Sequence, residues 1–494
     1  MANKPNKKQK KIGIFLFHRD FRLTDNVGFI TANQECDILY PVFLFTVEQI
    51  GRSNPYKSNN AIQFMLDSLE SLETEIGEKG GHLHVFLNST SGITGSIQQM
   101  DYLLDKWGAN SLYFNQDYTP YAVKRDQAFL KLCERKGVEC KMCSDYYLLE
   151  PGTVMNQQKI PYRIFSAFYA AFLGENKQIP TLKRANTFKS LIMSAKRKNE
   201  TLQSETTLNK MRSKLLVTEN KMMVQGGRIN GLRLLQQSGK TQNKYSETRD
   251  YMAKGTSHLS AYLKFGCVSV REVYYYWKRH FGVHSDIVRQ LVWREFFTNL
   301  LYYYGDDCLD QRAFDPKYRK LPWLKKNSTK QSAEHFKKWC EGKTGVPIVD
   351  AAMRELNTTG YMHNRSRMIV ANFLIKTLLL DWRLGEQYFA QKLIDYDIAS
   401  NNGNWQSIMG GGAYQTPYFR VMNPWIQSAK FDSDAEYIKK WVPELTDVPV
   451  KIIHKWYDLE EDEREEICPN YPSPIADYWK QKEKVLALYK KYLD

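Results

Sequence analysis

Short apolar runs alternate with amphipathic stretches over the first 145 residues of the chain. The apolar, β-branched and aromatic runs predict strands, and the stretches between them show helical periodicity. Strands that alternate with helices indicate a parallel sheet with crossover connections. Because residues 13–17 are apolar without alternation, both faces of this sheet should be covered. We predict a Rossmann-like, doubly wound domain over residues 11–145, with strands at 12–17, 38–45, 82–87 and 111–114 and helices that include 61–75 and 121–136.

The pattern changes twice after this region. Residues 146–222 are polar, basic and aperiodic, which is typical of a long inter-domain connector. After Gly226-Gly227 apolar residues recur at spacings of three and four almost to the C-terminus, and this predicts an all-helical domain over residues 223–494. The fold class is therefore α/β plus all-α. The chain contains no GxGxxG sequence, which argues against an ordinary NAD fingerprint.

The charge balance favours a polyanionic partner such as nucleic acid. The chain has 70 Lys+Arg against 54 Asp+Glu, a net charge of +16 and a pI near 9.2. Its eight cysteines show no repeated spacing, which fits a reducing compartment, and Cys140 and Cys143 lack two further ligands at comparable spacing, so no metal is predicted. No apolar run reaches signal-peptide or membrane-spanning length. We expect an intracellular, soluble protein without a membrane partner; cytoplasm and nucleus both stay open.

Several clusters of residue types can carry chemistry, and each also has an ordinary structural reading. Thr256, Ser257 and Ser260 lie before a helix-like segment, where they suit either a diphosphate or a plain helix cap. Gln290, Trp293 and Arg294 fall at helical spacing and would present an amide, an indole and a guanidinium together, or form part of a buried aromatic helix.

Two further clusters follow towards the C-terminus. Asn364 and Met368, four residues apart on one helix, suit a flat and mostly apolar ligand. Asp395 and Asp397 flank Tyr396 in a loop-like segment, and a helical arginine such as Arg367 could neutralise Asp395.

Taken together these motifs resemble the photolyase/cryptochrome family, from about Ile12 to the C-terminus. The resemblance rests on TSHLS at 256–260, WREF at 293–296, MHNRSRM at 362–368, DYDIASNNGNW at 395–405 and RDFRLTDN at 19–26. The chain is most similar to class I cyclobutane pyrimidine dimer (CPD) DNA photolyases. This resemblance implies a lyase in which light drives an electron from reduced FAD into a pyrimidine dimer flipped out of DNA, with a Rossmann-like antenna domain.

The resemblance also assigns residues to roles. The residues implied for FAD binding are Tyr245, Thr256, Ser257, His258, Leu259, Ser260, Arg294, Arg367, Asp395, Tyr396, Asp397 and Asn401. Those implied for the dimer and the DNA backbone are Arg249, Gln290, Trp293, Asn364, Arg365, Met368, Arg420 and Gln427. The catalytic set is Asn401 beside flavin N5, Gln290 against the dimer, and a relay of three tryptophans from the flavin to the surface, Trp405, Trp382 and Trp323.

Two departures from the family pattern bear on the lesion. Gln290 stands where class I enzymes usually have a glutamate, and Ser407 where many have a second tryptophan against the dimer. Repair of (6-4) photoproducts is therefore an alternative, as are a cryptochrome-like blue-light photoreceptor and a flavin-free nucleic-acid-binding protein. A second, antenna chromophore would be folate or deazaflavin, between which the residues do not choose. The protein is expected to act on damaged DNA as a monomer.

Overall fold

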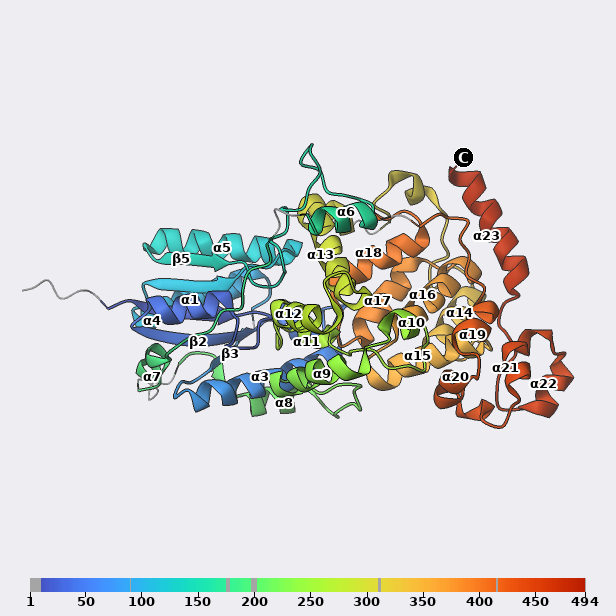
Figure 1. Ribbon diagram of the computed structural model, residues 1–494, viewed down its shortest axis with the longest axis horizontal. Helices are drawn as coiled ribbons and strands as arrows, with labels where there is room; N and C mark the ends of the chain where they lie inside the picture. The colour runs from blue at the N-terminus through green and yellow to red at the C-terminus, as the bar shows by residue number, and fades with distance from the viewer. Residues whose placement is uncertain are drawn as a thin grey trace, which may run out of the picture.

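A sheet with its helices forms one end of the molecule, and helices alone build the rest (Figure 1). The computed structural model describes residues 10–88, 90–174, 178–196, 202–309, 312–414 and 416–493. The last helix, α23 (Tyr478–Leu493), runs along the outer side of the helical part, far from the sheet (Figure 1). The expected order of an α/β part followed by an all-helical part is confirmed.

The sheet has six strands in the order β5-β4-β1-β2-β3-β6. The first five in chain order are parallel, with Ile12 opposite Ile38 and Gly13 opposite Ser111, whereas β6 runs antiparallel to β3. Parallel strands need crossover connections, and helices supply them. The strands are β1 (Ile12–Phe17), β2 (Ile38–Phe45), β3 (His84–Leu87), β4 (Ser111–Asn115), β5 (Glu139–Cys143) and β6 (Glu205–Thr206).

Helices cover both faces of this sheet. Successive side chains of a strand point to opposite faces, so Ile14 and Leu16 pack in one core with α4 (Ile93–Trp107) and α5 (Pro120–Lys136). Phe15 and Phe17 pack in another with residues of α1 and α3. The doubly wound architecture is confirmed, and the remaining helices of this region are α1 (Val27–Glu35), α2 (Val47–Ile50) and α3 (Asn59–Glu78).

The connector contributes more structure than its composition predicts. Within 146–222 it forms α6 (Phe165–Phe172), α7 (Lys189–Ala195), the edge strand β6 and α8 (Leu208–Leu215). Helix α7 packs against β2, and Leu191 is fully buried there. These elements are stabilised by packing on the sheet rather than by their own propensity, which is why the polar sequence did not reveal them. The domain boundaries themselves stay predictions.

After β6 the regular secondary structure of the described chain is α-helical, apart from short 3-10 and π-helical turns and one isolated bridge between Leu324 and Leu380; loops join these elements. The longest of these helices is α13 (Asp286–Tyr304), whose C-terminal part meets the sheet end through the rings of Tyr302 and Tyr118. The other helices are α9 (Arg228–Thr241), α10 (Tyr245–Thr248), α11 (Ser260–Lys264), α12 (Val270–Phe281), α14 (Lys330–Glu341), α15 (Pro347–Thr359), α16 (Asn364–Asn372), α17 (Trp382–Lys392), α18 (Ile398–Met409), α19 (Pro424–Phe431), α20 (Glu436–Trp441), α21 (Val450–His454) and α22 (Glu461–Ile467).

A buried charge network joins the two parts of the molecule. Arg271, on α12, donates from Nε to Asp25 at 2.9 Å and from Nη2 to Asp145 at 2.8 Å. Arg22 donates to the other oxygen of Asp145 at 2.5 Å. All four side chains are at most 3% exposed. Such pairs need complete hydrogen bonding in a low-dielectric interior, so the 19–26 motif fixes the sheet end against the helical part.

Among the described residues, no helix combines the length and apolar character needed to cross a membrane.

Candidate functional site

Four helices bring most of the predicted site residues together. Helix α13 packs against α10 and α18, and α16 also packs against α18 (Figure 1). Each helix presents side chains from its first turns or from one face, so residues more than a hundred positions apart become neighbours. The turn at 256–260 and the loop before α18 join them.

The turn at 256–260 keeps polar groups close to Tyr361. Thr256 Oγ1 lies 3.0 Å from the Tyr361 hydroxyl, and the His258 ring lies 4.8 Å from the Tyr361 ring. His258 has a φ of +51°, an uncommon conformation for a residue other than glycine. Within the described chain its buried Nδ1 has no hydrogen-bond partner, and burial lowers its pKa. Leu259 is buried, and α11 begins at Ser260.

The predicted pairing of Arg367 with Asp395 is confirmed. Arg367 Nη2 donates to the two carboxylate oxygens at 2.9 and 3.1 Å, and its Nε donates to the Met362 carbonyl at 2.9 Å. The Asp395 side chain is 7% exposed, so its charge needs this partner. The guanidinium also lies 5.8 Å from the Tyr361 ring centroid. The pair thus connects α16 to the loop before α18.

Asp397 caps α18 and faces three cations. Its side chain accepts a hydrogen bond from the Ser400 N–H at 3.1 Å. Burial raises the pKa of this carboxyl, but Lys264, Arg19 and Arg294 outweigh burial and lower its pKa overall. Arg19 Nη1 lies 3.8 Å and Lys264 Nζ 4.0 Å from the carboxylate. Asp397 therefore stays ionised between the sheet end and the helical part.

Asn401 is oriented by Glu386, a residue that the sequence analysis missed. Asn401 Nδ2 donates to Glu386 Oε1 at 3.1 Å, and the Tyr396 hydroxyl donates to the same oxygen at 3.0 Å. Burial raises the pKa of Glu386 and raises that of Tyr396 well above its usual value. Because its Nδ2 is engaged by Glu386, Asn401 keeps Oδ1 as its acceptor. Glu386 follows Trp382 by four residues on α17, and this helical spacing was the signal that could have found it.

Helix α13 divides its polar groups between two directions. Trp293 stacks on Phe165 of α6, with centroids 3.5 Å apart and planes at 4°, and meets Tyr414 edge-on at 5.4 Å. Gln290 Nε2 donates back to the Asp286 carbonyl at 3.0 Å. Arg294 instead turns towards residues 146 and 147, donating to the Tyr146 carbonyl at 2.6 Å. The predicted common face therefore holds Gln290 and Trp293 but not the Arg294 guanidinium.

Ser407 is bonded to a neighbouring hydroxyl group. The Ser407 hydroxyl lies 2.9 Å from that of Thr416, and the side chain is buried. The Tyr414 ring packs beside Trp293, and the Tyr414 carbonyl and the Ser407 nitrogen both lie close to Gly412. Neither Tyr414 nor Phe165 carries a signal in the sequence, since contacts between loops and distant helices follow from the fold alone.

The residues expected to meet DNA differ in how free they are. Asn364 starts α16 with an exposed side chain, and its Nδ2 lies 3.9 Å from Met368 Sδ, which confirms that the two share a helix face. Arg365 donates to Asp250 at 2.6 Å and stacks on Phe431 at 4.4 Å. Three others follow: Arg249 pairs with Asp286 at 3.3 Å, Arg420 is exposed, and Gln427 has a buried Oε1 without a partner in the described chain.

The three tryptophans of the expected relay differ in exposure: Trp405 and Trp382 are buried, and Trp323 is half-buried. Trp405, on α18, is 3% exposed and lies against Gly385 of α17, three residues from Trp382, which is 1% exposed. Trp382 Nε1 donates to the Arg312 carbonyl at 3.0 Å. The bridge between Leu324 and Leu380 brings the half-buried Trp323 to the start of α17. The relay stays a prediction, since all three rings also belong to or pack against the helical core.

Comparison with known proteins decides the family. Residues 13–185 match the family model of DNA photolyase, and residues 287–491 match that of the FAD binding domain of DNA photolyase. A deoxyribodipyrimidine photo-lyase of Alkalihalophilus pseudofirmus is 31% identical over 489 residues, which cover 96% of this chain and 97% of that protein. The chain belongs to the DNA photolyase family. It carries the FAD-binding domain of that family.

Solved structures of this photolyase family agree in fold. A photolyase of Sulfolobus tokodaii with two FAD molecules superposes with a TM-score of 0.81 at 36% identity, over 97% of this chain and 100% of that chain. A cryptochrome of Synechocystis superposes with a TM-score of 0.85 at 26% identity, with the same coverage. The two-domain photolyase/cryptochrome fold is thus shown, and both branches of the family share it.

A cavity of about 1420 Å³ lies where the carboxyl ends of the sheet strands meet the helical part of this photolyase-family chain. Open α/β sheets bind ligands at this edge. From the sheet end the lining includes His18, Phe43, Tyr121 and Arg125, and from the helical part Lys264, Trp382, Glu386, Tyr396 and Asn402. Tyr396 and Glu386 thus lie between this cavity and Asn401.

Proposed function

We propose that the protein is a light-driven deoxyribodipyrimidine photo-lyase that splits cyclobutane pyrimidine dimers in DNA. The observation that carries the proposal is the arrangement on α18, where a neutral Asn401 and a buried Trp405 share one helix next to the neutralised Asp395 and Asp397. The relative in Alkalihalophilus pseudofirmus, named for this activity, matches nearly the whole chain. When bound, reduced FAD supplies the electron that light transfers to the dimer.

The residues around this site fit an FAD. His258 Nδ1, which has no partner among the described residues, and the Thr256 hydroxyl offer polar contacts at the turn before α11. The half-buried Tyr245 and the buried Leu259 add apolar surface. Arg367 and Asp395 offer paired donors and acceptors at the other side. Asn401 Oδ1 can accept a hydrogen bond from an N–H group of the ligand, because Asn401 Nδ2 already donates to Glu386. The Asn401 side chain itself adds no negative charge next to an anionic reduced ligand.

The substrate would lie over α13 and α16. Trp293, held by Phe165, offers a fixed indole edge, and Gln290 and Asn364 offer amide donors and acceptors. Tyr414 packs edge-on against Trp293 and adds a second ring beside the indole. The dimer must leave the helical stack to reach these side chains, as in other enzymes that flip bases.

A second chromophore is part of the proposal. We place it in the large cavity, whose walls combine apolar rings with Arg125, Lys264 and Glu386. The photolyase of Sulfolobus tokodaii holds two FAD molecules, so a second FAD joins folate and deazaflavin as a candidate. Mass spectrometry of the chromophores released from the purified protein would identify which of the three is bound.

The test is repair itself. The reduced protein is illuminated with oligonucleotides that contain either a cyclobutane dimer or a (6-4) product, and recovery of intact thymines is followed by chromatography, with dark controls. Recovery from the cyclobutane dimer alone, and only in light, is the expected result. Recovery from the (6-4) product alone would assign the other lesion. If a protein that holds FAD repairs neither lesion, a photoreceptor without repair activity would be favoured. The structural similarity to the Synechocystis cryptochrome is the observation behind this alternative.

The tryptophan relay has its own test. Trp323→Phe removes the ring at the exposed end and keeps most of its volume, so light-driven reduction of bound flavin should slow while repair by chemically reduced protein is retained. Trp479→Phe, on the exposed face of α23, is the matched control. An unchanged photoreduction rate in Trp323→Phe would show that the electron takes another route.

A further inference from the structure

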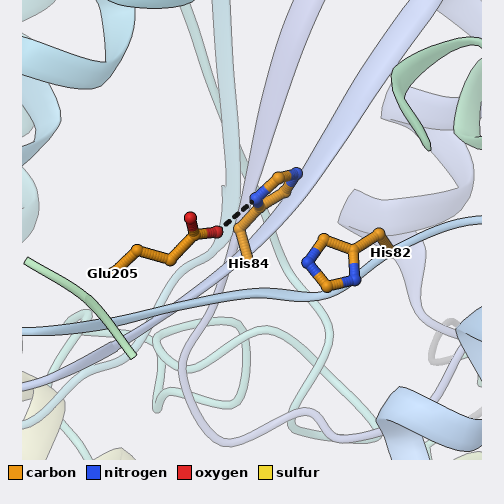
Figure 2. Close-up of side chains that lie close together, drawn as sticks. All are labelled: His82, His84 and Glu205. Atoms are coloured by element: carbon orange, nitrogen blue, oxygen red, sulfur yellow. Dashed lines mark hydrogen bonds and ion pairs between the residues drawn. The ribbon is translucent and has the colours of Figure 1, made fainter. Parts of the chain in front are cut away.

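Two histidines and a glutamate lie together at the outer edge of the sheet, away from the large cavity. Figure 2 shows His82 and His84 beside the side chain of Glu205, which comes from β6. Residues two apart in an extended chain point to the same side, so His82 and His84 share a face. In the antiparallel pair of β3 with β6, Phe86 is opposite Glu205, and this places Glu205 diagonally next to His84 on that face.

The three side chains have different freedom to move. His84 is 4% exposed and packs against the stacked rings of Trp107, at 5.0 Å, and Tyr40, at 5.8 Å. Glu205 is exposed, and its Oε1 lies 2.9 Å from His84 Nδ1. His82 is half-buried, with its ring 4.6 Å from the His84 ring at 83°. One ligand atom from each residue falls within 4.8 Å of the others.

These distances are close to those of a metal site. Ligands of a tetrahedral zinc ion lie about 2.0–2.2 Å from the metal, and therefore roughly 3.3 Å from one another. The pair of His84 and Glu205 is already near this spacing. His82 would have to turn its ring towards this pair for all three ligand atoms to bind one ion.

We propose that His82, His84 and Glu205 bind one divalent transition-metal ion of the zinc class. Two neutral imidazoles and one carboxylate form a donor set that suits Zn²⁺, and the exposed side of Glu205 leaves a fourth position for water. The sequence analysis predicted no metal because Cys140 and Cys143 lack further ligands. That argument does not apply to this site, because its three ligands are other residues. The metal has no part in the proposed repair reaction.

The ion would fasten the connector to the sheet. Strand β6 has only two residues, and its backbone contacts with β3 are the pairs of Val85 with Thr206 and Phe86 with Glu205, next to a hydrogen bond from Leu87 N–H to the Ser204 carbonyl at 3.0 Å. So short an edge strand is marginal by itself. A metal ion that bridges side chains of both strands closes the long chain segment between residues 84 and 205 and stabilises the pairing.

Metal binding is tested on the full, untagged protein after removal of metals with a chelator, because a polyhistidine tag binds the same ions. Co²⁺ and then Zn²⁺ are titrated, with calorimetry for stoichiometry and visible absorption for geometry. We expect one equivalent of Co²⁺ with the intense visible bands of a tetrahedral ion, lost when Zn²⁺ displaces it. Zn²⁺ should also raise the midpoint of thermal unfolding.

Variants separate this site from adventitious binding. Glu205→Gln changes an exposed side chain and keeps its shape, and His82→Asn changes a half-buried one, so both should fold. Each is expected to weaken binding by about tenfold or more. His284→Asn, at an exposed histidine before α13, is the control and should bind as the original protein does. Binding that is absent from the original protein, or equal in all variants, would overturn the proposal and leave a hydrogen bond between His84 and Glu205.

Discussion

Asn401 is a neutral side chain in a densely charged part of the molecule. Asp395 is paired with Arg367, and Asp397 faces Arg19 and Lys264, so these two carboxylates are compensated. The Asn401 amide is held by Glu386 and brings no charge of its own. Under the proposed function, the neutral Asn401 side chain makes it easier for bound FAD to take up a negative charge next to α18.

Replacing Asn401 by aspartate tests this electrostatic role. Asn401→Asp would place a carboxylate beside the bound flavin and next to Glu386, so the midpoint potential of the one-electron step that yields fully reduced FAD should fall by tens of millivolts. For one electron, roughly 60 mV corresponds to about 1.4 kcal/mol. Spectroelectrochemical titration measures it. Asn404→Asp, an exposed position on the same helix that bonds the Ser400 carbonyl, is the control. Equal potentials in the two variants would separate Asn401 from the flavin.

Glu295 predicts how stability depends on pH. This buried carboxylate accepts hydrogen bonds from the N–H groups of Leu148 and Leu149, but burial raises its pKa from 4.5 to about 7. Between these values the folded protein binds more protons than the unfolded chain, so the free energy of unfolding should fall as pH rises from about 4.5 to 7, by about 3 kcal/mol from this group. Urea unfolding at several pH values measures the slope. Glu295→Gln should flatten it, and a variant with an unchanged slope would assign the effect to other groups.

Pairings within the site could be predicted where helical spacing or charge neutralisation required them. Arg367 with Asp395 follows from the need to neutralise a buried carboxylate, and Asn364 with Met368 follows from the helix repeat. The direction of the Arg294 side chain does not follow from either rule, because its partner is a carbonyl 148 residues away in the connector. Sequence spacing fixes neighbours on one helix, but not contacts between elements.

Helices α17 and α18 show how element packing sets the positions of the tryptophans. A Cβ at Gly385 would overlap the Trp405 ring and the Leu374 side chain. The two helices therefore approach more closely than any side chain at position 385 would permit. This close approach brings Trp405 towards the helix that begins with Trp382.

Gly385→Ala tests this packing. The added methyl forces Trp405 or α17 to shift, and overpacking of this kind typically lowers the free energy of unfolding by roughly 1–3 kcal/mol. Gly77→Ala, in α3, is the matched control: no atom lies within 4 Å of its Cβ, and alanine favours a helix over glycine, so about 1 kcal/mol of stabilisation is expected. Denaturant unfolding of both variants measures the difference. Stabilisation of both would show that α17 and α18 can separate freely.

The elements themselves were predictable in proportion to their periodicity. Strands β1 and β2 were found at their observed ends, because buried parallel strands are apolar throughout. Strand β5 was missed, since Glu139-Cys140-Lys141 has no apolar run, and its pairing with β4 decides its conformation. Strand β6 has two polar residues and exists only through its pairing with β3. Tertiary contacts rather than propensity created both.

At the scale of the whole molecule, the charge of +16 predicts salt-sensitive binding to DNA. Net charge alone does not identify which arginines contact phosphate. Arg365 and Arg420 were both assigned to the DNA backbone, yet they differ in this structure. Arg365 is 15% exposed and pairs with Asp250, whereas Arg420 is exposed and its carbonyl is held by Lys376 and Asn372.

This difference gives a prediction for salt dependence. Each phosphate contact adds about 0.9 to the slope of log affinity against log salt on duplex DNA, because a counterion is released. Arg420→Gln should therefore lower that slope by about 1. Arg365→Gln should change it less, because Asp250 already neutralises the charge of Arg365.

Binding to a duplex that contains a dimer is measured in the dark, between about 50 and 200 mM salt. Arg233→Gln, exposed on α9, which packs on α3 and α12, is the control and should keep the original slope. A larger change in slope for Arg365→Gln than for Arg420→Gln would mean that Arg365 leaves Asp250 to reach the phosphates. The DNA backbone would then lie near Phe431, on which Arg365 stacks, rather than near the exposed Arg420. Helix α19 would in that case belong to the interface.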